Sequence, residues 1–365
     1  MKVGLVTPEF SPLEGELGAF ACELYRVLEY SGCDPVVLTT RPSSLPRVAY
    51  IRSMGPMSFS YKFALRSKGF IRETGVDVLH VLGGPEGVRL LASVSVPVIY
   101  TVPGLFHHHR SGMKNSWTSV LQRTVSGILE RISYGHATRI VCPTSFVSNL
   151  INKQYTAHFD KIVVIPTGVD VSRYESSDQD RHVGRLLYVG NAKPYLGLEI
   201  LLKALKIVVE ANPNAHLVIV EGDTFSRYKI DHWLQQMELE DSVYVVGDIS
   251  EEELAEEYGK AEIMVVPALA GGLGVRCLEA MACGLPVVGT RVHGVEEIVE
   301  DDSTGILVPP CDVNALADII ISLLRDSERR HELGERGRFN ATRKYDSRTL
   351  VHEVIKLYTD VLHRP

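Results

Sequence analysis

A glycine-rich turn precedes a helix-forming stretch in the last third of the chain. Gly271, Gly272 and Gly274 let a backbone come close to a ligand. The helix predicted to start near Val275 adds free N–H groups and the positive end of its dipole, which makes an anion site suited to a diphosphate. Glu279, one turn inside, places a carboxylate where ribose hydroxyls would donate hydrogen bonds. A helix-surface salt bridge is the alternative role for Glu279.

The elements that must position this turn follow a repeating pattern. Short apolar runs rich in β-branched residues alternate with helical stretches, which predicts βαβ units and parallel sheets. The pattern stops at a polar stretch, YESSDQDRHVG at 174–184, and then restarts with five further strands. The fold class is therefore α/β, with two similar Rossmann-like parallel-sheet domains. A helix is predicted over about 343–362, and ligands are expected beyond the carboxyl ends of the strands.

The strand candidates share this apolar, β-branched character. In chain order they are KVGLVT, PVVLTT, VDVLHVL, VPVIYTV, TRIVCPT and KIVVIPT before the linker, and RLLYVG, HLVIVEG, SVYVVGD, AEIMVVP and LPVVGT after it.

The segment AEIMVVPALAGGLGVRCLEAMACGLPVV at 261–288 resembles the donor-binding signature of the family 4 glycosyltransferases. IPTGVD at 165–170, TGILVPPCD at 304–312 and the opening MKVGLVTPEFSPLEGELG agree with the same family, so the resemblance covers nearly the whole chain. It implies a GT-B architecture, in which two Rossmann-like domains face each other across a cleft. Residues 1–170 would then form the acceptor-side domain, to which residues 343–365 return, and residues 181–342 the nucleotide-sugar domain.

The activity that the resemblance implies is retaining, metal-independent transfer of a hexosyl group from a nucleotide-diphosphate sugar, with no cofactor. The acceptor is expected to be a lipid-linked or other glycan precursor. No catalytic residue is assigned. The expected donor-binding residues are Gly15, Lys193, Gly272, Gly274, Val275, Arg276 and Glu279.

Three positions in the second half depart from the family pattern. The first of two glutamates expected near the donor sugar falls on Gly271, while Glu279 matches the second. An arginine and a lysine expected near the diphosphate are replaced by Asn191 and Leu196. Each lost charge-assisted bond is worth about 1.5–3 kcal/mol. Lys193 and Arg276 are candidate substitutes; the alternative is that both point to solvent. Asn191 is a candidate to line the cleft.

Two departures lie in the first half. A pair of glycines is expected near the N-terminus, and Glu16 replaces the second of them after Gly15. A carboxylate ~4 Å from a phosphate would repel it by roughly 4 kcal/mol at an effective dielectric constant near 20. Either Glu16 turns away, the loop is remodelled, or no diphosphate binds. Pro103 stands where a histidine is expected, and the run that begins at His107 either lines the cleft or lies on a solvated surface.

These departures motivate a second hypothesis: a catalytically silent homologue that serves as a binding or partner subunit of an active glycosyltransferase. A phosphorylase- or epimerase-like enzyme on the same architecture is a weaker third.

Charge is distributed unevenly over the 365 residues. Residues 1–166 carry a net charge of +6 and the remainder −13. The segments 58–72 and 107–132 mix aromatic and basic residues and suit either an anionic membrane surface or helices packed on a sheet. The six cysteines form no CxxC pair, so reduced thiols are expected. The protein is predicted to be cytoplasmic, with peripheral contact to the inner face of the membrane, and no nucleic-acid partner is predicted.

Overall fold

The computed structural model describes residues 1–11, 15–40, 47–51, 69–83, 94–103, 131–132, 134–154, 160–174, 181–221, 224–247 and 249–363. The chain divides into two units. The first comprises residues 1–12, 17–167 and 347–365, and the second comprises residues 13–16 and 168–346.

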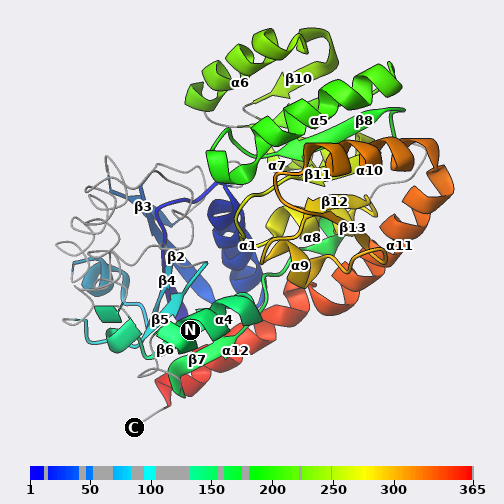
Figure 1. The fold of residues 1–365 in the computed structure, drawn as a ribbon. Coiled ribbons are helices and arrows are strands. Elements are labelled where there is room, and N and C mark those ends of the chain that lie inside the picture. Colours follow the sequence, from blue (N-terminus) through cyan, green and yellow to red (C-terminus); the bar gives the residue numbers. More distant parts are fainter. Residues whose placement is uncertain are drawn as a thin grey trace. The chain divides into compact units, whose positions relative to one another are not determined.

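The first unit is a parallel sheet between two helical layers (Figure 1). Within the described residues the strand order is β3-β2-β1-β4-β5-β6-β7, so the direction of winding changes between β1 and β4. The strands are β1 (Lys2–Val6), β2 (Asp34–Thr39), β3 (Val48–Tyr50), β4 (Val78–Leu82), β5 (Val98–Thr101), β6 (Arg139–Cys142) and β7 (Ile162–Val164).

The core of this unit consists of two clusters, one on each face of the sheet, because side chains alternate between the faces along each strand. Val3 and Leu5 pack with helices α1 (Glu16–Tyr30) and α12 (Ser347–Leu362), whereas Val36 and Leu38 pack on the face that α4 (Ser145–Gln154) covers. Because successive side chains of a strand point to opposite faces, a strand covered on both faces is apolar throughout.

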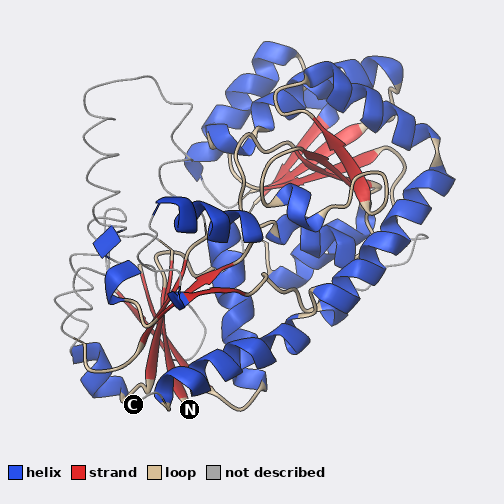
Figure 2. Ribbon diagram, turned by 60° about the horizontal axis from the view of Figure 1, so that its bottom comes forward, coloured by secondary structure: helices blue, strands red, loops and turns tan. Residues whose placement is uncertain are grey.

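The second unit repeats this design with the order β10-β9-β8-β11-β12-β13, and its change of direction lies between β8 and β11. Figure 2 shows its strands, in red, lying between helices. The strands are β8 (Arg185–Val189), β9 (His216–Val220), β10 (Val243–Val246), β11 (Ile263–Val266), β12 (Val287–Thr290) and β13 (Gly305–Val308). The helices are α5 (Leu198–Ala211), α6 (Thr224–Met237), α7 (Glu251–Lys260), α8 (Val275–Ala282), α9 (Val295–Ile298), α10 (Val313–Arg325) and α11 (Ser327–Lys344).

The predicted fold class, two parallel-sheet Rossmann-like domains, is confirmed. The expectation of five strands after the linker is wrong, because β13 adds a sixth. Strand β3 was not expected from the sequence either. All six cysteines are free thiols. In the described part of the chain, no helix combines the length and the apolar character needed to cross a bilayer.

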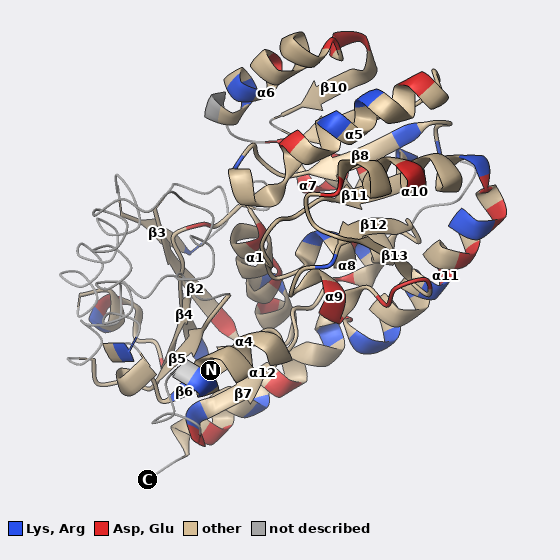
Figure 3. Cartoon of the chain, in the orientation of Figure 1, with Lys and Arg blue, Asp and Glu red and all other residues tan. Residues whose placement is uncertain are grey.

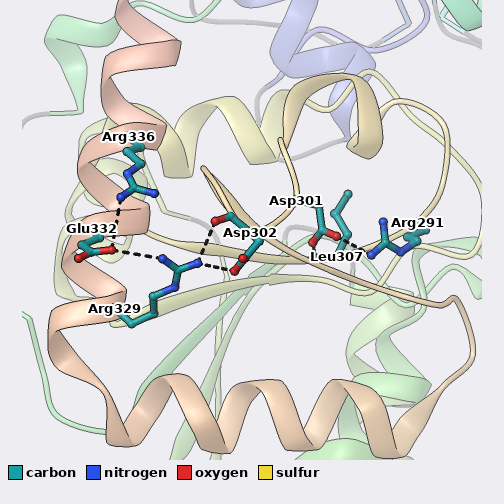
Figure 4. Close-up of polar contacts among 7 residues, drawn as sticks. All are labelled: Arg291, Asp301, Asp302, Leu307, Arg329, Glu332 and Arg336. Atoms are coloured by element: carbon teal, nitrogen blue, oxygen red, sulfur yellow. Dashed lines mark hydrogen bonds and ion pairs between the residues drawn. The ribbon is translucent and has the colours of Figure 1, made fainter.

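Surface ion pairs fix the turn before β13 in the second unit. Asp301 accepts hydrogen bonds from Arg291 at 2.5 Å and from the backbone N–H of Leu307 at 2.8 Å. Arg329 of α11 binds the neighbouring Asp302 and also pairs with Glu332 (Figure 4). Figure 3 shows both signs of charge along α11. The network ties Arg291, at the end of β12, to the strand beside it.

A buried polar chain joins α12 to the first sheet. His80 on β4 bonds through Nδ1 to the hydroxyl of Tyr358 and through Nε2 to that of Thr101, both at 2.6 Å. Burial lowers the pKa of His80 to about 3. The imidazole is therefore neutral at physiological pH and acts as a connector in the core.

We expect acid to weaken this unit through His80. Folding lowers the pKa of His80, so between about pH 6.5 and pH 3 the unfolded state binds a proton that the folded state does not. The free energy of unfolding therefore falls by about 1.4 kcal/mol for each unit by which the pH is lowered in this range. His80→Gln removes this term. The difference in unfolding free energy between wild type and His80→Gln, measured in urea, should therefore shrink from pH 7 to pH 4.5. A difference that stays constant with pH would contradict the assignment.

Candidate functional site

Three loops of the second unit meet at the carboxyl ends of β8, β11 and β12, where the sheet changes direction. The backbone N–H of Leu269, after β11, donates to the carbonyl of Tyr195, after β8, at 2.8 Å. The hydroxyl of Thr290, at the end of β12, donates to the carbonyl of Ala268 at 2.5 Å. Such a switch point is where open α/β sheets bind ligands.

Glycines allow these loops to approach backbone to backbone. A Cβ at Gly271 would lie under 3 Å from the carbonyl oxygen of His293, and one at Gly197 equally close to that of Pro267. Gly197 also has a φ of +73°, which favours glycine. In this conformation the loop therefore has no room for a side chain at position 271.

Helix α8 begins at Val275 as the sequence predicts. Gly274 precedes it with φ +70° and ψ +16°, a left-handed conformation that turns the glycine loop into the helix. The first N–H groups of a helix have no partner within it, and they carry the positive end of its dipole. The expected anion site at Gly272, Gly274 and Val275 is therefore present as backbone geometry, while its role in donor binding stays a prediction.

Arg276 and Glu279 form a buried ion pair on α8. The guanidinium donates to Oε2 of Glu279 at 2.8 Å, and the hydroxyl of Tyr258, on α7, donates to the same oxygen at 2.6 Å. The exposed fractions of Arg276 and Glu279 are only 5% and 4%. Burial alone would lower the pKa of Arg276, but Glu279 raises it above its ordinary value, so the guanidinium stays charged.

This pair settles two alternatives. Glu279 is not part of a helix-surface salt bridge, because both members of its ion pair are buried. Arg276 does not point to solvent, because its side chain turns along α8 toward Glu279. Tyr258, which the sequence analysis missed, completes the cluster. Tyr258 lies on another helix, 21 residues before Glu279 in the sequence. No local sequence pattern therefore indicated that the two side chains are in contact.

The loop after β8 holds Asn191 and Lys193 in different environments. Asn191 is buried, and its Oδ1 accepts the backbone N–H of Lys193 at 3.2 Å. Lys193 itself is exposed. A second cation, Lys229 of α6, donates to the carbonyl of Ala192 at 3.0 Å and was not expected from the sequence. Asn191 thus shapes the loop, and Lys193 presents a charge to solvent.

Glu16 contacts the glycine loop. Oε2 of Glu16 accepts the backbone N–H of Leu273 at 2.7 Å, and it occupies the space that a Cβ at Gly272 would fill. The sequence left open whether Glu16 turns away from the expected anion site. It does not, because its side chain reaches the glycine loop. Gly15, just before it, has a φ of +149°.

The remaining expected positions add little geometry. His107 lies outside the described residues, as do most of the segments 58–72 and 107–132. Pro103 follows β5 and is partly buried. Among the described residues, no group of three or more His, Cys, Asp or Glu side chains is arranged to hold a metal ion.

Two family models match the chain in succession. Residues 17–173 match the model "Glycosyltransferase Family 4", and residues 176–339 match "Glycosyl transferases group 1". The chain belongs to the family 4 glycosyltransferases. The resemblance seen in the sequence is thereby confirmed.

Individual relatives of this glycosyltransferase agree with the assignment. The chain is 27% identical to an uncharacterized glycosyltransferase of Methanocaldococcus jannaschii over 87% of its length and 84% of the relative's. A sucrose-phosphate synthase from Thermosynechococcus elongatus matches with a TM-score of 0.84, at 23% identity and 99% coverage of both chains. A protein of Anabaena, solved in complex with UDP-glucose, matches with a TM-score of 0.79 at 16% identity, over 99% of this chain and all of its own. These structures share the GT-B fold.

We expect that the glutamate missing at position 271 cannot simply be restored. Gly271→Glu, like the smaller Gly271→Ala, forces a Cβ against the backbone of His293 and should lower the free energy of unfolding by about 1–3 kcal/mol or more. Gly69→Ala is the control, because its Cβ would meet only a side-chain oxygen of Glu73 at 3.8 Å. Equal stability of Gly271→Ala and wild type in chemical denaturation would contradict the close approach.

The buried pair yields a second expectation. Arg276→Met leaves the carboxylate of Glu279 buried without its partner and should destabilise the fold by about 3–5 kcal/mol. Adding Glu279→Leu, in a Tyr258→Phe background, removes the stranded polar groups and should recover most of that loss. Thermal or urea unfolding of the single and combined variants measures this. If the combined variant does not recover stability, other groups must also stabilise these side chains.

Proposed function

We propose that this glycosyltransferase transfers a hexosyl-type group, with retention, from a nucleotide-diphosphate sugar to an acceptor. The observation that carries the proposal is the start of α8, whose first N–H groups open onto the switch point of the second sheet beside a buried carboxylate. A helix N-terminus of this kind suits the phosphates of a nucleotide donor.

Each donor-binding residue has a role in the proposal. The backbone of Gly272, Gly274 and Val275 would hold the diphosphate. Lys193, exposed on the neighbouring loop, would approach it as a point charge. Glu279 would accept the ribose hydroxyls. Both of its hydrogen bonds described above end on Oε2, so Oε1 is the oxygen that we assign to the sugar.

The sequence suggested Arg276 as a direct ligand of the phosphates, but we propose a different role for it. Its guanidinium is engaged with Glu279, but its positive charge lies within the first turn of α8. We propose that it stabilises the diphosphate through its field. Gly15 would keep the N-terminal segment close to the donor.

Known structures support a nucleotide donor. The Anabaena protein that shares the fold was solved with UDP-glucose bound. We extend this only to the class of donor, without naming the base or the sugar. Transfer without a resident metal, a lipid-linked or glycan-precursor acceptor, and a cytoplasmic location at the inner face of the membrane remain parts of the proposal.

Two observations favour a second candidate, a catalytically silent partner of an active glycosyltransferase. The loop at Gly271 has no room for a carboxylate next to the proposed sugar, and the carboxylate of Glu16 takes the N–H of Leu273, which lies between Gly272 and Gly274 of the expected anion site. Both features reduce the support that a leaving diphosphate would receive.

Titration with UDP-, GDP- and ADP-sugars by calorimetry separates the two functions. We expect saturable binding of one nucleotide class and about tenfold weaker binding by Lys193→Ala, which corresponds to about 1.4 kcal/mol. Lys203→Ala is the matched control, because Lys203 is also exposed but pairs with Glu199 on α5. If no nucleotide binds up to millimolar concentration, the enzyme is excluded and the partner role is favoured.

A further inference from the structure

The carboxylate of Glu16 lies at the start of α8, on the donors that an anionic ligand would use. Its Oε2 accepts the N–H of Leu273 at 2.7 Å. The same oxygen fills the space left by the missing side chain of Gly272. Residue 16 belongs to the same unit as this loop. The expected anion site therefore already contains an anionic group supplied by the chain itself.

We infer that Glu16 is an internal competitor for the donor's diphosphate, so a nucleotide must displace this carboxylate before it can use the N–H groups at the start of α8. The inference rests on the proposed function, because it concerns the occupancy of the same site. In this inference, Glu16 determines which anionic groups this site binds and how tightly it binds them.

Two physical effects work in the same direction. A backbone N–H has one proton to donate, so Leu273 cannot serve the carboxylate and a phosphate equally well at once. A carboxylate beside a phosphate also repels it. Where family members carry a glycine instead, neither effect arises.

The groups around Glu16 show that it is held and not merely nearby. Burial raises the pKa of the Glu16 carboxyl, whereas the N–H groups of Leu273 and Gly274 and the charge of Arg276 lower it; Glu279 raises it again. The charge of Arg276 thus acts on Glu16 as well as on Glu279, its hydrogen-bond partner. The carboxyl of Glu16 stabilises the turn in the absence of a nucleotide.

A different role for Glu16 makes the opposite prediction. If it replaced the carboxylate missing at Gly271, it would assist the donor sugar, and its loss would weaken binding of a nucleotide-sugar and slow transfer. The observed hydrogen bond favours competition, because it uses a backbone donor of the anion site.

The test compares wild type, Glu16→Ala, Glu16→Gln and Glu29→Gln by calorimetry with UDP and with inorganic pyrophosphate. Glu16→Ala removes the competing group, and Glu16→Gln removes only its charge. Glu29→Gln makes the same charge change at an exposed position of the same helix. We expect Glu16→Ala to bind UDP at least tenfold more tightly than wild type, Glu16→Gln to tighten binding in the same direction, and Glu29→Gln to match wild type.

A ligand-free measurement checks the contact itself. Amide hydrogen exchange at Leu273 should accelerate in Glu16→Ala and slow again when pyrophosphate is added. Exchange at Leu273 that is the same in Glu16→Ala and wild type would overturn the contact.

The outcomes separate this inference from the proposed function. Binding of UDP with the same Kd in wild type and Glu16→Ala, or weaker binding in Glu16→Ala, overturns the competition while the nucleotide site stands. Failure of all four proteins to bind either probe, together with failure of the wild type to bind any of the UDP-, GDP- and ADP-sugars, removes the proposed function and the competition with it.

Discussion

The close approach of three backbone loops at the switch point of the second sheet is the constraint on which the candidate site depends. Gly197 and Gly271 pack against carbonyl groups of neighbouring loops, where a Cβ would have no room. This packing fixes the direction in which the chain enters α8, and with it the direction of the first helical N–H groups. The close approach at Gly271 uses the space that a side chain would need, so the loop in this conformation has no room for the family's glutamate.

Beneath the loops, a buried charged cluster decides how α8 is held. Arg276 and Glu279 lie on the same helix, and Tyr258 joins them from α7. Buried charges are tolerated where each has a partner and its hydrogen bonds. The cluster therefore links α8 to α7. A residue that looks from the sequence like a free cation for phosphate is already committed to this link.

Much of the fold was predictable because it depends on local signals. Apolar β-branched runs indicate strands covered on both faces, and the start of α8 at Val275 follows from the glycine before it. The two strands that were missed, β3 and β13, have three and four residues. Each lies at an edge of its sheet and pairs with one neighbour, β2 in one case and β12 in the other, and a single sequence does not contain that pairing.

By itself, the sequence determined the fold class, the family and the position of the glycine turn before α8, because each is encoded in residues adjacent along the chain. Only the tertiary structure decided what the charged side chains do. Arg276 pairs within its own helix, Glu279 is buried beside a tyrosine from another helix, and Glu16 reaches a backbone N–H 257 residues away. The physical reason is that a long charged side chain binds the best partner within its reach, and that partner is set by packing.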